Sequence, residues 1–340
     1  MRRATAVLLL AGLLAFAGGS LTAGTAGASS ARRREPRRTM ATYEWHNAGD
    51  LAAAEVRQRL RFLRAHGFTT VYLELGSYLE ATDQPKGTPG RQRRLNELRR
   101  QLRRFVATAS SLGLAVHGLG GGPTWIGELS YLGPLLVRLV GRYNAGVAPR
   151  ERLQGVQLDI GPYAVDGFLQ RGEEGFVEYL DALRGIVRAF KRIRYQHANR
   201  YLQLGLAIPF WFDAEDDEAP GPVRFRGRVK PVAHHIIDMV RRLTRAYLVV
   251  MSYRNLTDGA DGSIAHARGE FDYAAEIGAR CGLVVAQQYG DVEPASITFQ
   301  GFTRSEFQAA ADAITQAFSG YRQFRGLAVD NLDAYMAARP

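Results

Sequence analysis

The chain contains one cysteine in 340 residues, Cys281, so it has no internal disulfide. No cysteine stands where a lipid would be attached after an amino-terminal export segment. A chain of this kind depends on a large hydrophobic core for its stability. Cys281 follows an expected helix and precedes an apolar run, so we expect a small buried hydrophobic residue rather than a nucleophile.

Motifs that define several other classes of site are absent. No GxGxxG sequence follows the first expected strand, which argues against a dinucleotide site. No HxH or HExxH spacing occurs, which argues against a metal site. The glycine-rich run 118–122 precedes Pro123 and is typical of a loop. Basic residues are not interleaved with aromatic ones in a recognisable motif. We therefore expect no metal, no organic cofactor and no nucleic-acid partner.

Positive charge is in excess: the chain has 44 lysines and arginines but only 33 aspartates and glutamates, which gives a formal net charge of +11. A basic surface attracts anions, and an acidic polysaccharide is one such partner. Arginine-rich codon usage is the alternative explanation. Hydrophobic residues make up 46% of the chain, which suits one large α/β domain or two small ones.

The amino terminus has the pattern of a secretory signal. Arg2 and Arg3 precede an apolar run over residues 6–17, and small residues follow up to Ala28. The run is too short to span a bilayer comfortably, so we expect cleavage after Ala28, secretion, and no stable membrane insertion. A retained anchor is the alternative. Residues 29–39 are an arginine-rich flexible leader, and residues 40–340 form the folded domain.

From Met40 onward, short apolar runs alternate with longer amphipathic stretches, which is the βα rhythm of a parallel sheet. Eight strands in one domain favour a (β/α)8 TIM barrel over an open doubly wound sheet. The expected strands are 42–46, 69–75, 115–119, 155–160, 202–211, 247–253, 283–288 and 326–331. The expected helices are 50–66, 91–112, 128–144, 173–199, 229–245, 265–281 and 304–318, followed by a short closing turn over 332–339.

Acids, amides and aromatic residues stand at the carboxyl ends of these strands, where a barrel keeps its reacting groups. Asp159 follows the apolar strand at 155–160 and is the main catalytic candidate, with Glu74 or Asp330 as its partner carboxylate. Aromatic faces pack against sugar rings, and acids and amides hydrogen-bond hydroxyl groups, so the mixture predicts a carbohydrate cleft. The candidate substrate-binding residues are Tyr253, Arg254, Gln288, Trp125, Trp211, Asp213 and His46.

Structural roles are the alternative for several of these residues. Glu44 and Glu74 are also expected to pair with arginines at the barrel mouth. His46 and His117 are also expected to bond with backbone groups, and Trp211 to belong to the core.

Three stretches resemble the family 18 chitinases among the glycoside hydrolase barrels. Residues 159–161 align with the last DxE of the family's DxxDxDxE motif, residues 251–254 (MSYR) with its sixth-strand MxY motif, and residues 206–211 (LAIPFW) with its fifth strand. The general-acid glutamate of that motif is replaced by Gly161, its two earlier aspartates by Gln154 and Gln157, and the Asp or Asn after MxY by Arg254. Gly161 is also expected to adopt a positive φ before Pro162.

The resemblance implies an exported glycoside hydrolase-type barrel acting on a cell-wall or extracellular polysaccharide, and leaves its oligomeric state open. Because glycine cannot protonate a leaving group, another strand has to supply the second carboxyl group. A catalytically inactive polysaccharide-binding barrel is the first alternative. A metal-dependent hydrolase that uses His46, His117, Asp159 and Asp330 is the second.

Overall fold

The structure is a computed structural model, and it describes residues 38–213 and 220–340. The expected signal and most of the leader lie outside the described residues. Within the described ranges, no helix is both long and apolar enough to cross a membrane.

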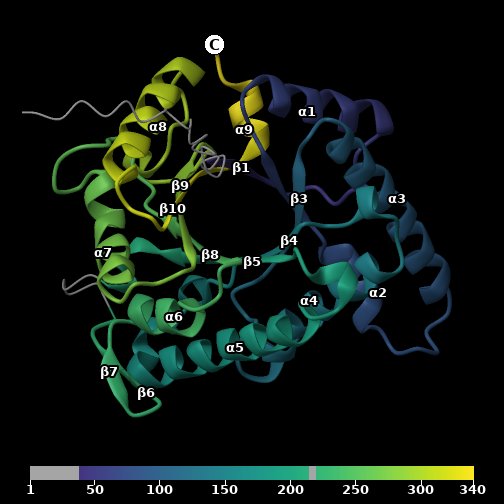
Figure 1. The fold of residues 1–340 in the computed structure, drawn as a ribbon, viewed down its shortest axis with the longest axis horizontal. Helices are drawn as coiled ribbons and strands as arrows, with labels where there is room; N and C mark the ends of the chain where they lie inside the picture. The colour runs from purple at the N-terminus through teal and green to yellow at the C-terminus, as the bar shows by residue number, and fades with distance from the viewer. Residues whose placement is uncertain (1–37, 214–219) are drawn as a thin grey trace, which may run out of the picture. The chain divides into compact units, whose positions relative to one another are not determined.

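The described residues form a closed barrel of eight parallel strands, as the sequence predicts (Figure 1). The order around the barrel is β1-β10-β9-β8-β5-β4-β3-β2, so the first and last strands pair and close it. Thr39, which the sequence assigned to the leader, is the first residue of β1 and pairs with Gly326. The strands are β1 (Thr39–Glu44), β2 (Thr70–Glu74), β3 (Ala115–Gly120), β4 (Gly155–Leu158), β5 (Gln203–Pro209), β8 (Ala246–Met251), β9 (Gly282–Gln288) and β10 (Phe324–Asp330).

Helices surround the strands (Figure 1). Gly67 and Gly113 follow α1 and α3 with φ of 80° and 74°, a conformation in which a residue with a Cβ is strained. At the start of α8, Thr303 and Glu306 form a capping box. The helices that the sequence predicts are α1 (Ala53–Ala65), α3 (Arg91–Ser111), α4 (Leu132–Ala145), α5 (Gly172–Ile193), α6 (Val232–Val240), α7 (Ser263–Glu276) and α8 (Arg304–Phe318).

Four local features differ from the sequence-based prediction. A helix, α2 (Gly76–Asp83), follows β2, and another, α9 (Leu332–Ala337), replaces the expected closing turn. A hairpin of β6 (Val223–Phe225) and β7 (Arg228–Lys230) precedes α6. The expected strand 202–211 ends at Pro209, so Trp211 lies in a 3₁₀ turn beyond it. Elements of three to eight residues are too short for their periodicity to be distinguished from a loop.

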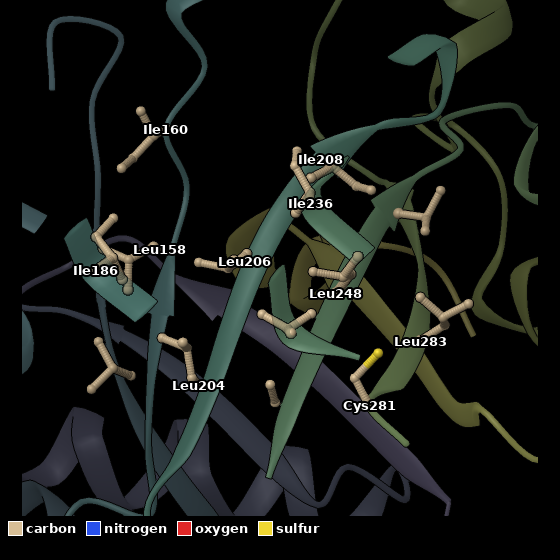
Figure 2. Packing of buried hydrophobic residues seen from close by; sticks show 14 of the residues in the cluster. Leu158, Ile160, Ile186, Leu204, Leu206, Ile208, Ile236, Leu248, Cys281 and Leu283 are labelled. Carbon is tan, nitrogen blue, oxygen red and sulfur yellow. The ribbon is translucent and has the colours of Figure 1, made fainter. Parts of the chain in front are cut away.

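Two hydrophobic layers hold the barrel together. The larger lies between the strands and the helices, and Figure 2 shows part of it, from Leu158 and Leu204 across to Leu283. Cys281 is fully buried in this layer, as the sequence predicts. The smaller layer fills the barrel interior and is rich in tyrosine, with Tyr43, Tyr72 and Tyr247. Successive strand residues point to opposite faces, so most strands supply both layers; β8, for example, has Leu248 in the larger layer and Val249 in the smaller one.

Candidate active site

Asp159 and Asp330 come together at the carboxyl end of the barrel. Asp159 directly follows β4, and Asp330 is the last residue of β10. Burial, and then the nearby charge of Asp330, raise the pKa of Asp159 to about 6. None of the described residues donates a hydrogen bond that would offset this shift. Asp159 is therefore a carboxyl group that holds its proton more tightly than an exposed aspartate does.

Asp330 has a different environment, because both of its carboxylate oxygens accept hydrogen bonds. The indole Nε1 of Trp45 donates to Oδ1 at 2.8 Å, and Nε2 of Gln288 donates to Oδ2 at 3.0 Å. Burial raises the pKa of Asp330, and these two donors oppose that effect. Two adjacent carboxyl groups with unequal stabilisation of their ionised forms are suited to different roles, one as acid and one as carboxylate.

The orientation of the Gln288 amide is fixed by the backbone. Its Oε1 accepts hydrogen bonds from the N–H groups of Tyr289 at 2.8 Å and Gly290 at 2.7 Å. Since backbone N–H groups can only donate, Nε2 has to be the atom that faces Asp330. Gln288 was predicted to bind substrate, but in the structure it holds a catalytic candidate.

Aromatic side chains surround the two carboxyl groups. The ring of Trp45 stacks on Tyr43, with centroids 5.6 Å apart, and 45% of Trp45 is exposed. Burial raises the pKa of the Tyr253 and Tyr163 hydroxyls, and the nearby charge of Asp159 raises both further. Trp211 meets the ring of Tyr163 edge to face at 5.2 Å. Trp211 is half-buried and packs against the larger hydrophobic layer, which agrees with the core role that the sequence suggested as the alternative to substrate binding.

Trp125 lies over the glycine loop that follows β3. A Cβ at Gly120 would be 3.4 Å from its ring, and one at Gly122 would be 3.2 Å away. The glycines therefore let a large ring approach the backbone closely at this edge of the mouth. Trp45 stands at a strand end, but the sequence analysis did not include it among the candidate substrate-binding residues. Its signal is a tryptophan directly after the first strand, one residue beyond Glu44.

Glu74 does not pair with Asp159 in this structure. Its carboxylate accepts a hydrogen bond from the N–H of Gly76 at 2.5 Å. It borders a small cavity that is also lined by Tyr78 of α2, by residues of α3 and by Asn47 in the loop after β1. Burial raises the pKa of Glu74 to about 7. Of the two partners predicted for Asp159, Asp330 is the one whose charge acts on it.

Asp213 and Arg254 also lie to one side of the pair. Asp213 faces Gly269 on α7, and burial raises its pKa to about 6. The guanidinium of Arg254 is bound to Asp261 at 2.8 Å and lies over the ring of Phe210. Both are thus engaged with α7 or with the loop before it.

The ring of His46 contacts two carboxylates and not the backbone group that the sequence suggested. Its Nδ1 lies 2.8 Å from Glu44 Oε1 and 3.6 Å from Asp333. The other oxygen of Glu44 binds Arg59 at 2.7 Å, and Arg59 binds Asp333 at 2.6 Å. Glu44 is 1% exposed and pairs with an arginine, as the sequence suggested for this residue.

His117 lies away from the mouth, so the four residues of the alternative metal-dependent site are not brought together. Its ring is buried inside the barrel, and Nδ1 lies 2.8 Å from the hydroxyl of Tyr247. Among residues 38–213 and 220–340, no three His, Cys, Asp or Glu side chains are grouped to hold a metal ion. The prediction of a positive φ at Gly161 is also wrong, because its φ is −110°. What constrains Gly161 is the ring of Tyr163, whose Cζ would lie 3.0 Å from an added Cβ.

No family model matches the chain, and no curated protein matches it in sequence. Similar solved structures are glycoside hydrolases. The catalytic domain of a beta-amylase from Paenibacillus polymyxa is 8% identical over 87% of this chain and 92% of its own, with a TM-score of 0.49. An exo-beta-1,4-mannosidase from Opitutaceae bacterium strain TAV5 is 13% identical over 86% and 52%, with a TM-score of 0.49.

A GH18 chitinase from Cycas revoluta in complex with (GlcNAc)4 is 12% identical over 87% of this chain and 95% of its own, with a TM-score of 0.48. The chain thus spans about half the length of the mannosidase and nearly all of the chitinase. At these scores the similarity concerns the barrel fold alone. The chemistry at the barrel mouth has to be inferred from the residues of this chain.

Proposed function

We propose that this protein is an exported glycoside hydrolase that cleaves a cell-wall or extracellular polysaccharide with Asp159 and Asp330. The observation that supports the proposal is the pairing of two carboxyl groups in unequal environments at the barrel mouth. Glycosidases need such a pair, one protonated and one ionised, on the two sides of the scissile bond.

Asp159 is the general acid in this proposal. With a pKa of about 6, it is protonated in a larger fraction of molecules than an exposed aspartate and is still acidic enough to give the proton up. The proton moves from Asp159 to the glycosidic oxygen as the bond between that oxygen and the anomeric carbon breaks. Gly161, which occupies the position of the chitinase glutamate, takes no part.

Asp330 is the ionised partner. Its carboxylate either takes a proton from the attacking water or forms a bond to the anomeric carbon, and these alternatives correspond to inversion and retention of configuration. Trp45 and Gln288 hold both oxygens in place, which limits the motion of the carboxylate. Among the rings at the mouth, Trp45 is the one with the largest exposed face for a sugar.

The test compares four forms of the mature protein beginning at Ser29: wild type, Asp159→Asn, Asp330→Asn and Asp312→Asn. Asp312 is an exposed residue of α8 and serves as the matched control. Each form is incubated with neutral and acidic wall and capsule polysaccharides, and reducing-end release and binding are measured separately. Acidic polymers belong in the panel because the net charge is +11.

We expect wild type and Asp312→Asn to release reducing ends from at least one polymer. Asp159→Asn and Asp330→Asn should lose most of that release, on the order of a hundredfold or more, and still bind the polymer. Binding by wild type without any release would contradict hydrolysis and favour an inactive binding barrel. Full activity in Asp159→Asn would exclude the proposed acid.

A further inference from the structure

A polar cavity lies at the opposite end of the barrel from Asp159 and Asp330. It has a volume of about 60 Å³ and is bordered by residues at the amino-terminal ends of the strands. Thr39 and Thr70 are the first residues of β1 and β2, and Arg325 is the second residue of β10. One buried water needs roughly 10–15 Å³, so the cavity has room for several waters or one small polyatomic ion.

Two buried polar atoms of the cavity wall have no hydrogen-bond partner in the part of the chain that the structure describes. They are Nε2 of His117 and the hydroxyl of Tyr72, which lies close to the Tyr247 hydroxyl but forms no hydrogen bond of normal geometry with it. The two side chains are 3% and 1% exposed. The other ring nitrogen of His117 is occupied by Tyr247, so the ring cannot turn to satisfy Nε2 without losing that bond. Buried polar groups without partners are uncommon, and two that border one polar cavity are suited to hydrogen-bonding a ligand inside it.

The surrounding backbone is adapted to these side chains. A Cβ at Gly155 would lie 2.4 Å from Nδ1 of His117, and one at Gly205 would lie 2.4 Å from the ring of Tyr247. In both cases only glycine leaves room for the polar ring inside the barrel. Two of the side chains that border the cavity, His117 and Tyr247, therefore each fit against a glycine of a neighbouring strand.

Among the described residues that border the cavity, Arg325 alone carries a formal charge. It is partly buried, and its burial lowers the pKa of the guanidinium. Its one hydrogen bond goes to the carbonyl oxygen of Arg322, and no carboxylate among the described residues lies within ion-pair distance. A half-buried cation without a counter-ion attracts an anion strongly, because little water screens it.

We propose that this cavity binds a small inorganic oxyanion of the size of phosphate, held by Arg325, His117 Nε2 and the Tyr72 hydroxyl. The site is independent of the substrate site at the mouth. An anion that binds only the folded barrel raises its stability as the anion concentration rises.

The test is a calorimetric titration of the mature protein with sodium phosphate, at constant ionic strength, for wild type, Arg325→Gln and Arg322→Gln. Arg322 neighbours Arg325 but does not border the cavity, so it controls for the loss of one positive charge. We expect Arg325→Gln to weaken phosphate binding about tenfold or more, and Arg322→Gln to change it less than about threefold. Equal losses in the two variants, or no binding by wild type at 10 mM phosphate (roughly the weak limit of a specific ion site), would overturn the proposal.

Tyr72→Phe supplies a second test that does not depend on removing a charge. The substitution deletes only the unpartnered hydroxyl, so it should raise the unfolding temperature in the absence of phosphate. It should also reduce the increase that phosphate produces, by several-fold in apparent affinity. An unfolding temperature that falls, with an unchanged response to phosphate, would show that the hydroxyl bonds within the protein and does not face an anion.

Discussion

Replacing Asp159 with asparagine should stabilise the folded protein at neutral pH. The folded state raises the pKa of this carboxyl to about 6, whereas an unfolded chain leaves it near ~3.9. At neutral pH the carboxylate is ionised in both states, and in the folded state it has to ionise where water is scarce and Asp330 is near. Asparagine keeps the shape and the polarity of the side chain and removes the ionisation.

The size of the effect follows from the shift in pKa. A shift of roughly two units corresponds to about 3 kcal/mol at a pH above both values. Because Asp159 is partly exposed, water relieves some of this, and we expect a gain between about 1 and 3 kcal/mol. Between about pH 4 and pH 6 the folded state binds more protons than the unfolded state, so wild-type stability falls as pH rises through this window. Asp159→Asn lacks that slope.

Urea denaturation at pH 4.5, 5.5, 6.5 and 7.5 measures both quantities. The free energy of unfolding of Asp159→Asn should exceed that of wild type by an amount that grows with pH and levels off near pH 7. Asp312→Asn, on the exposed face of α8, should differ from wild type by less than about 0.5 kcal/mol at every pH. A variant that is less stable than wild type at pH 7.5, or whose advantage is the same at all four values, would refute the environment described for Asp159.

Three further substitutions test the surroundings of the site. Trp45→Phe removes the indole donor to Asp330, so the carboxyl carbon of Asp330 should titrate at a higher pH by NMR; an unchanged titration would exclude the bond. Arg59→Met removes the arginine partner of the buried Glu44, leaves it only the contacts with His46, and should destabilise the fold by about 3–5 kcal/mol in urea; a loss under 1 kcal/mol would contradict the burial. Gly161→Ala fits the backbone but presses on the neighbouring tyrosine ring, so we expect a loss of about 1–3 kcal/mol, and a neutral change would mean that the ring moves freely.

The barrel could be predicted from the sequence because its strands are buried on both faces. Such strands appear as continuous apolar runs, and the helix stops at Gly67 and Gly113 separate them from their neighbours. The short elements could not be predicted. The hairpin before α6 has strands of three residues, and α2 follows β2 after a single residue, Leu75. In segments this short, packing against the rest of the domain determines the secondary structure more than the local sequence does.

The convergence of Asp159 and Asp330 could also be predicted, since parallel strands of a barrel end at the same rim. The directions of individual side chains could not. Glu74 is likewise at a strand end, but it bonds to the backbone of the helix that follows it. Gln288 has the polarity of a substrate ligand, and the turn after β9 uses its oxygen instead. A strand end fixes the position of a residue, and the loop beyond it fixes where the side chain points.

The contrast between acids and amides in this barrel argues for hydrolysis over binding alone. A surface that only bound sugar hydroxyls could use an amide at position 159, which donates and accepts hydrogen bonds and has no ionisable proton. Amides do occupy other polar positions here: Gln157 bonds to the hydroxyl of Tyr43, and Gln287 donates to the carbonyl oxygen of Ser252. At position 159 the chain has a carboxyl group whose ionisation destabilises the fold. A group of that kind is useful where a proton has to be given up and regained, and the two hydrogen bonds to its neighbour Asp330 oppose the effect of burial on that second carboxyl group.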